Sequence, residues 1–265
     1  MTKENLTDVI KKELLKSGFP LELSCRKAIN KSGWGTILSR FYLDDSGVEH
    51  EIDLLAYKQS KLKSEAKHHL VSSNLIGECK KNASNHWVFF CDDISVRILN
   101  TASTLKPKGH KLIVAGIERH DPALKEHHYF KMTTCSQYCM AFKIGNEKNQ
   151  IFDGLQQLFS AYKYMRKTNE YYMEKRDPKE GIWTKVYYPV LIFDGRLFVS
   201  QLTGDELDVK EVNHLLYSGQ HPSYLDTQIT VDVVCADFFP DYLKLLEKDH
   251  SAFCSFIKSK TEVTN

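Results

Sequence analysis

The order of periodic segments along the chain limits its fold more than any other feature. Residues 151–176 have the apolar spacing of a long helix. Strand-like runs lie before it, at 35–58 and 74–90, and after it, at 185–202 and 227–239. Side chains repeat every 3.6 residues around a helix and every two residues along a strand, so the sequence separates the two kinds of segment. Strands interrupted by a long helix predict an α/β fold with a mixed central β-sheet flanked by helices.

Shorter signals complete this outline. Helices are expected at residues 5–16, at 20–32 and in the segment that follows residue 239. Asp44 to Gly47 has the composition of a tight turn, and so does Asp194-Gly195, so a β-hairpin is predicted around each of them.

Two further expectations concern the organisation of the chain. Residues 111–118 (KLIVAGIE) read as another strand. No repeat, low-complexity segment or linker-like stretch interrupts the sequence, so a single elaborated domain over residues 1–265 is expected.

The composition is that of an ordinary globular protein, with 42% hydrophobic and 26% charged residues. The longest apolar runs, such as residues 187–193, are too short to span a bilayer, and the N-terminal segment lacks the apolar core of a signal peptide. We therefore expect a cytoplasmic protein that does not bind a membrane. The net charge is only +2, so a polyanionic partner would have to bind a local basic face.

The seven cysteines are scattered and odd in number: Cys25, Cys79, Cys91, Cys135, Cys139, Cys235 and Cys254. Most of them lie in apolar, strand-like contexts. Buried free thiols are therefore expected, rather than a framework of disulfide bonds.

The stretch IGECKK, residues 76–81, places an acid and an amine two residues apart in a strand-like run. Side chains two apart share one face of a strand, so Glu78 and Lys80 point the same way and Cys79 points the other way. Asp53 is an acid inside the apolar run of the preceding strand. Two buried carboxylates brought together raise each other's pKa, and a divalent cation removes that conflict.

The residue types around this pattern suit a hard cation. Asp53, Glu78 and the backbone carbonyl of Cys79 offer oxygen ligands, which Mg²⁺ and Mn²⁺ prefer. Lys80, adjacent to them, can orient or help deprotonate an attacking water and offset charge that develops on a phosphate. The alternative is a partly buried ion pair between Lys80 and either acid, with a structural role only.

Asp53 followed by Glu78-x-Lys80 on the next strand resembles the PD-(D/E)XK motif of the restriction-endonuclease-like nucleases. A helix that carries Glu22 precedes the hairpin, as it does in that superfamily, but Ile52 stands where the motif has proline. The motif-bearing core covers about residues 18–90, and residues 151–260 would complete the sheet.

The resemblance implies a restriction-endonuclease-like three-layer fold and Mg²⁺- or Mn²⁺-dependent hydrolysis of phosphodiester bonds in nucleic acid, DNA more than RNA. It implies that Asp53, Glu78 and Lys80 are catalytic. The metal would be bound by Asp53, Glu78, the Cys79 carbonyl and, in addition, Glu22.

The resemblance also suggests partners. Such an enzyme would act alone, as a homodimer, or as the cutting subunit of a multiprotein defence, restriction or repair system. A non-catalytic module of the same fold, which binds nucleic acid or a protein, is the alternative.

Basic residues near the motif are candidates for contacts with a phosphate backbone, and their alternative role is an ordinary solvated surface. The principal candidates are Arg26, Lys27, Lys58 and Lys81, followed by Lys31, Arg40, Lys61, Lys63 and Lys67. The polar stretch 59–73 is expected to be a loop between strands, either an ordinary one or a flap over a substrate.

Aromatic and metal-binding side chains give weaker signals. Trp34, Trp87, Phe89 and Phe90 could stack on bases, although their apolar neighbours favour core packing. An alternative zinc site could use residues chosen from His120, His127, His128, Cys135 and Cys139, without a second pair at a zinc-finger interval.

Two other groups are expected on the surface. The tandem pairs His68-His69 and His127-His128 are predicted to be exposed. Gln156 and Gln157, with Tyr162, are similar to a Gln…Tyr feature of some nucleases of the superfamily. Their spacing differs by one residue, so both glutamines are expected to lie on the helix surface.

Overall fold

The structure is a computed structural model. It describes residues 5–38, 40–44, 46–63, 68–81, 86–91, 100–103, 124–141, 149–175, 182–220 and 228–262.

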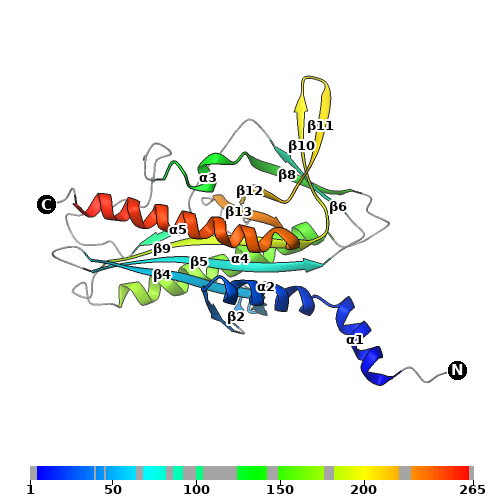
Figure 1. Cartoon of the computed structure of the whole chain (residues 1–265), viewed down its shortest axis with the longest axis horizontal. Helices are drawn as coiled ribbons and strands as arrows, with labels where there is room; N and C mark the ends of the chain where they lie inside the picture. Colours follow the sequence, from blue (N-terminus) through cyan, green and yellow to red (C-terminus); the bar gives the residue numbers. More distant parts are fainter. Residues whose placement is uncertain are drawn as a thin grey trace.

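An 11-stranded sheet forms the centre of the molecule (Figure 1). Its strands follow the order β1 (Gly35–Ile37), β4 (Leu54–Lys63), β5 (His68–Lys81), β9 (Ile182–Asp194), β13 (Gln228–Cys235), β12 (His214–Gln220), β8 (Thr134–Ala141), β6 (His86–Cys91), β10 (Leu197–Thr203) and β11 (Glu206–Val212). An additional strand, β7 (Asn100–Ser103), pairs with β9.

The sheet is mixed, as the sequence predicts. β5, β9 and β13 run parallel to one another, while β4 runs antiparallel to β5. A separate hairpin of β2 (Arg40–Leu43) and β3 (Glu49–Ile52) precedes β4. Parallel neighbours require a crossover connection, and the long helix α4 (Gln150–Glu174) lies in the connection between β5 and β9. The α/β class is therefore confirmed.

Helices cover both faces of the sheet (Figure 1). On one face, α4 buries a stripe of residues spaced three or four apart, which includes Ile151, Leu155 and Leu158. On the other face, α2 (Phe19–Lys31) and α5 (Phe239–Glu262) pack on a second apolar cluster, which includes Leu21 and Tyr242. Glu78 and Lys80 point to the α4 side of β5.

Three other helical segments complete the described chain: α1 (Leu6–Lys16), the single turn α3 (His128–Lys131) and the 3₁₀ turn η2 (Ala236–Phe238). α1 buries none of its residues. None of the described helices has the combination of length and apolar character that a transmembrane span requires.

Two of the predicted connections are wrong. β9 and β10 do not form a hairpin around Asp194-Gly195. The two edges of β9 are occupied by β5, β13 and β7, whereas β10 pairs with β6 and β11. Residues 59–63 and 68–73 form strands and not the predicted loop, because β4 continues to Lys63 and pairs with β5 from His68 onward.

Other expectations are confirmed or lie outside the described residues. The hairpin around Asp44 to Gly47 forms as β2–β3, and Gly47 adopts a φ of 82° that favours glycine. The strand predicted at 111–118 and His120 lie outside the described residues. The single-domain organisation stays a prediction.

The expectation for the cysteines needs one correction. Cys91 and Cys135 are joined by a disulfide bond, because the β6–β8 pairing places them opposite each other after an irregularity at Phe90. Cys25, Cys79 and Cys235 are buried free thiols as predicted, whereas Cys139 is exposed. Pairing of strands this far apart in sequence cannot be read from cysteine spacing.

Candidate functional site

Asp53 lies in a bend between β3 and β4, at the end of the β4–β5 ladder. The last residue pair of that ladder is Leu54 with Gly77. Beyond that pair, the side chain of Asp53 replaces the backbone as hydrogen-bond acceptor: its Oδ2 accepts a bond of 2.8 Å from the backbone N–H of Cys79. This bond places the acid beside the segment of β5 that carries Glu78 and Lys80.

Glu78 and Lys80 share one face of β5, as the two-residue period predicts. The Lys80 ammonium donates to Oε1 of Glu78 at 2.6 Å and to Oε1 of Gln157 at 2.6 Å. Gln157 lies on α4, so the helix and the strand together fix the position of the amine. The expectation that Gln157 is a plain surface residue is therefore wrong.

A glycine on α4 makes room for the Lys80 stem. A Cβ atom added at Gly154 would lie 3.2 Å from Cε of Lys80 and 2.8 Å from Cδ1 of Leu191. Contacts this short require neighbouring atoms to move, so Gly154 allows α4 to lie directly on β5 and β9. This packing holds the extended Lys80 side chain between helix and sheet.

Glu22 approaches Asp53 from the opposite face, on α2. Arg26, one turn further along α2, contacts Oε2 of Glu22 at 3.5 Å and donates to the backbone carbonyl of Asp53 at 3.0 Å. The guanidinium therefore ties α2 to the bend that carries Asp53. We call Glu22, Asp53, Glu78 and Lys80 the carboxylate site.

Negative charge in the carboxylate site is only partly compensated. Burial, and then the charge of Asp53, raises the pKa of Glu78 to about 8, although Lys80 opposes this shift. Burial also raises the pKa of Asp53 and, together with the Asp53 charge, that of Glu22. Nearby acids that all have raised pKa values attract protons, and they attract cations for the same reason.

The acids of the carboxylate site have the chemistry that a divalent ion needs, but their oxygen atoms do not converge on a single position. The donors are carboxylate oxygens, the type that Mg²⁺ and Mn²⁺ prefer. Among the described residues, however, the groups with three ligand atoms within 4.8 Å of one another do not include Glu22, Asp53 or Glu78. An ion could engage the second carboxylate oxygen of Asp53 and of Glu78, since one oxygen of each already accepts a hydrogen bond.

The basic residues proposed for nucleic acid lie in different surroundings. Arg26 is engaged by Glu22 and Asp53, as described above. Lys58 pairs with Glu247 of α5 at 2.9 Å, and Lys81 donates to the carbonyl of Leu15 in α1. Lys27 is exposed. Three of these four residues therefore already have partners within the protein, and their contact with nucleic acid stays a prediction.

The predicted aromatic stacking surface is mostly core. Trp34, Trp87 and Phe89 are buried, and the Trp87 ring stacks on that of Phe193 at 3.8 Å between centroids. The preference of the sequence for core packing is therefore confirmed for these residues.

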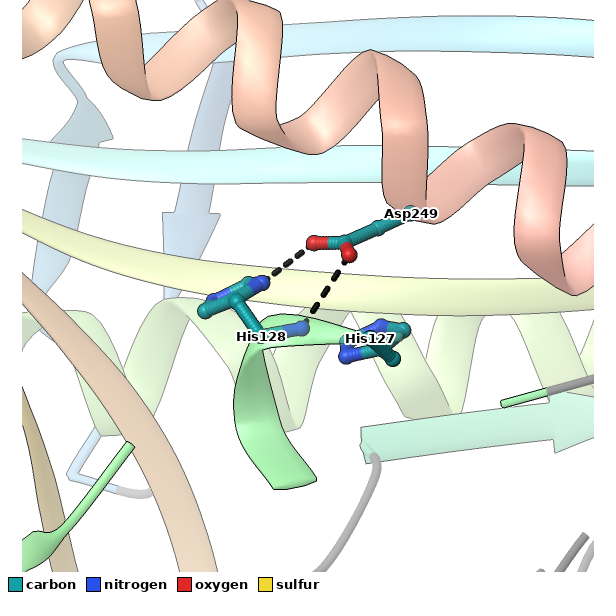
Figure 2. A group of neighbouring side chains, drawn as sticks. All are labelled: His127, His128 and Asp249. Carbon is teal, nitrogen blue, oxygen red and sulfur yellow. Dashed lines mark hydrogen bonds and ion pairs between the residues drawn. The ribbon is translucent and has the colours of Figure 1, made fainter. Parts of the chain in front are cut away.

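A second group of polar side chains is buried between the sheet and α5. His128 of α3 contacts a carboxylate with each ring nitrogen: Nδ1 with Oδ2 of Asp249, and Nε2 with Oδ1 of Asp232 at 2.8 Å. Nε2 of His214 reaches the same Asp232 oxygen at 2.7 Å. Figure 2 shows Asp249 extending from α5 toward His128. We call His128, His214, Asp232 and Asp249 the histidine cluster.

The two acid groups differ in electrostatics. Although burial alone would lower it, the charge and hydrogen bonds of Asp232 and Asp249 raise the pKa of His128 to about 9. His128 in turn, with His214, holds the pKa of Asp232 well below its usual range. By contrast, burial lowers the pKa of the neighbouring His127 to about 4.

The histidine cluster corrects two predictions. His127 and His128 are buried, not exposed, and so is His69, because each packs under elements distant in sequence. The zinc set of histidines with Cys135 and Cys139 is wrong for the described residues, because the Cys135 thiol is oxidised to a disulfide with Cys91. An acid inside the apolar run Val231–Val234 was the available signal, since Asp232 interrupts that run just as Asp53 interrupts its own.

Comparison with known proteins gives no relative: no protein-family model, curated protein or solved structure matches the chain.

Proposed function

We propose that this protein is a nuclease that depends on Mg²⁺ or Mn²⁺ and hydrolyses phosphodiester bonds in nucleic acid, DNA more than RNA. The observation that carries the proposal is the Asp53–Glu78–Lys80 arrangement: Asp53, in the bend before β4, accepts a hydrogen bond from the Cys79 N–H of β5, next to Glu78, which pairs with Lys80 on the same strand face. The order α2, β4, β5, α4, β9 is compatible with the restriction-endonuclease-like fold that this motif resembles.

The roles of the residues follow from their positions. Asp53 and Glu78, with Glu22 from α2, would hold the ion, which would stabilise the negative charge that develops on the phosphate. Lys80 would hold the attacking water beside the phosphorus and oppose the added charge. Gln157 keeps the ammonium at a fixed place, so that a water oxygen can form its bond to phosphorus while the bond to the 3′ oxygen breaks.

A second function is favoured by the Glu78–Lys80 ion pair itself. At 2.6 Å the pair gives Lys80 a counterion, so a structural role for Glu78 needs no metal ion. A non-catalytic module that binds nucleic acid or a protein partner would have the same pair.

Cleavage assays on the full chain separate the two. Supercoiled plasmid, linear duplex, single-stranded DNA and RNA are each incubated with Mg²⁺, Mn²⁺ or EDTA. If the protein is a nuclease, it should cleave at least one of these substrates, and EDTA should abolish the cleavage. Glu78→Gln and Lys80→Ala should reduce cleavage by about 10²–10⁴-fold without loss of nucleic-acid binding. Lys58→Ala is the matched control, because Lys58 lies on the adjacent strand but pairs with Glu247, and it should cut normally.

Two results would refute the nuclease. Binding without cleavage of any substrate by the unaltered protein supports the module. Cleavage that survives in Glu78→Gln shows that the activity comes from elsewhere.

A further inference from the structure

We propose that the histidine cluster is a structural zinc site, in which Nε2 of His128, Nε2 of His214 and Asp232 bind one Zn²⁺ ion. This inference is independent of the proposed nuclease, because the two groups use different residues and different ligand atoms. It rests on three observations: the convergence of the ligand atoms, the groups that orient them, and the two buried acids with a tyrosine hydroxyl that surround them.

The three ligand atoms already converge. They lie within 4.8 Å of one another, and Oδ1 of Asp232 is 2.8 Å from one imidazole nitrogen and 2.7 Å from the other. Ligands about 2.1 Å from zinc are separated by roughly 3.0–3.4 Å, so these atoms need to move apart by a few tenths of an ångström. Two imidazoles and a carboxylate suit Zn²⁺ better than Mg²⁺, which prefers oxygen alone.

The surrounding contacts are those that orient metal ligands in proteins. A histidine that binds a metal usually donates its other N–H to a carboxylate, and Nδ1 of His128 has Asp249 as this partner. The second oxygen of Asp232 accepts a hydrogen bond of 2.9 Å from the Tyr129 hydroxyl. His128 and Asp232 are thereby held in place by Asp249 and Tyr129, which do not themselves bind the ion.

The alternative triplet, His127 with His128 and Asp249, does not offer the same donors. Nδ1 of His127 accepts a hydrogen bond from the backbone N–H of Tyr129 at 3.2 Å, and its Nε2 bonds the Tyr188 hydroxyl at 3.1 Å. Both ring nitrogens of His127 are therefore engaged. Figure 2 shows that the bonds within this triplet join only His128 and Asp249.

Charge and hydrogen bonding favour an ion in the cluster. Each ring nitrogen of His128 faces a buried carboxyl group, so a single imidazole lies between two acids. A Zn²⁺ ion that replaces the Nε2 proton supplies two positive charges. The fully buried Tyr242 ring packs edge-on against the rings of His214 and His128, with 5.2 and 6.2 Å between centroids. Its hydroxyl faces Asp232 without a hydrogen bond of standard geometry, so this oxygen would be the nearest candidate for a fourth position.

The site would be structural because it is sealed. Asp232 is 0% exposed and His128 is 2% exposed, so a substrate has no access to the ion. Its ligands come from α3, β12 and β13, and Asp249 connects them to α5. The ion would fix α3 against the sheet and under the C-terminal helix.

Metal binding by the full chain tests the proposal. Metal-free protein is titrated with Zn²⁺ against a chromophoric chelator and, separately, with Co²⁺, whose visible absorption reports ligand type and number. We expect one equivalent of each ion beyond any that the carboxylate site takes up, the bands of a four- or five-coordinate site with nitrogen ligands, and a higher unfolding temperature with Zn²⁺. No stoichiometric uptake, or only the weak bands of an ion bound by six oxygens, would overturn the proposal.

Variants assign the ion to its ligands. His214→Gln and Asp232→Asn should weaken Zn²⁺ binding by more than 100-fold, and Asp249→Asn, which loses an orienting partner, by about 10–100-fold. His127→Gln should bind normally and exclude the alternative triplet. Glu78→Gln should also bind normally, and loss of the ion in this variant with retention in His214→Gln would refute the assignment. If His214→Gln does not fold, the Co²⁺ spectrum of the unaltered protein decides alone.

Discussion

The carboxylate site and the histidine cluster both bury acids, yet they compensate their charge in opposite ways. Around Asp53 and Glu78 the acids outnumber the nearby cations, and their pKa values are raised. Around Asp232 each acid oxygen faces a donor, and its pKa is lowered while that of His128 rises. The partners of a buried acid therefore indicate its role: the acids of the carboxylate site fit the proposed hard cation at a reacting phosphate, whereas the acids that face histidines hold elements of the fold together, directly or through the proposed zinc ion.

The largest difference should appear when one aspartate in each region is made neutral. Asp232→Asn removes the carboxylate shared by the buried His128 and His214, although Asp249 still faces His128, and it should lower the free energy of unfolding by about 3–5 kcal/mol. Asp53→Asn removes a carboxylate that burial already disfavours, so stability should change by less than about 1 kcal/mol. Urea denaturation of both variants in EDTA measures the difference, and equal losses would remove the distinction between the regions.

The dependence of stability on pH sharpens the comparison. Folded Glu78 keeps its proton up to about pH 8, whereas its ordinary pKa, which applies to the unfolded chain, is 4.5. Between these values the folded state binds more protons, so the contribution of Glu78 makes stability fall as pH rises. Replacing this residue in Glu78→Gln should raise the stability of metal-free protein by about 1–3 kcal/mol at pH 8 and by little at pH 5. A gain independent of pH would show that Glu78 titrates normally.

Gln157 and Gly154 should give smaller effects that are specific to the carboxylate site. Gln157→Ala removes one of the two acceptors that hold Lys80 and should slow cleavage by about tenfold, with little loss of stability. Gly154→Ala presses a methyl group on the Lys80 stem and on Leu191, so it should reduce both cleavage and stability. Gln156→Ala is the control for the first change, since the described structure bonds Lys80 to Gln157. Equal rates in the two glutamine variants would contradict a positioning role.

Local periodicity predicted the parts of the structure that depend on one or two adjacent elements. The two-residue period placed Glu78 and Lys80 on one face of β5, and the 3.6-residue period predicted α4. Gln157 was judged by its spacing from Tyr162, but its role depends on where α4 crosses β5. That crossing is a tertiary contact, which spacing along the helix does not determine.

The histidine cluster was not predictable in the same way, since its four members come from α3, β12, β13 and α5. Of the four residues, only Asp232 was indicated by the sequence, as an acid within an apolar run. No sequence pattern connects it with His128. The hairpin predicted at Asp194-Gly195 failed for a related reason. Its turn composition is suitable, but β5 and β13 occupy the edges of β9 where β10 would have paired.

The central claim, that the carboxylate site binds a hard divalent cation, is tested most directly by calorimetric titration of the full chain with Mn²⁺, with and without DNA. The account predicts uptake of at least one ion per chain and binding at least tenfold weaker in Glu78→Gln. Absence of Mn²⁺ uptake by the unaltered protein under both conditions, or equal uptake by the variant, would contradict it.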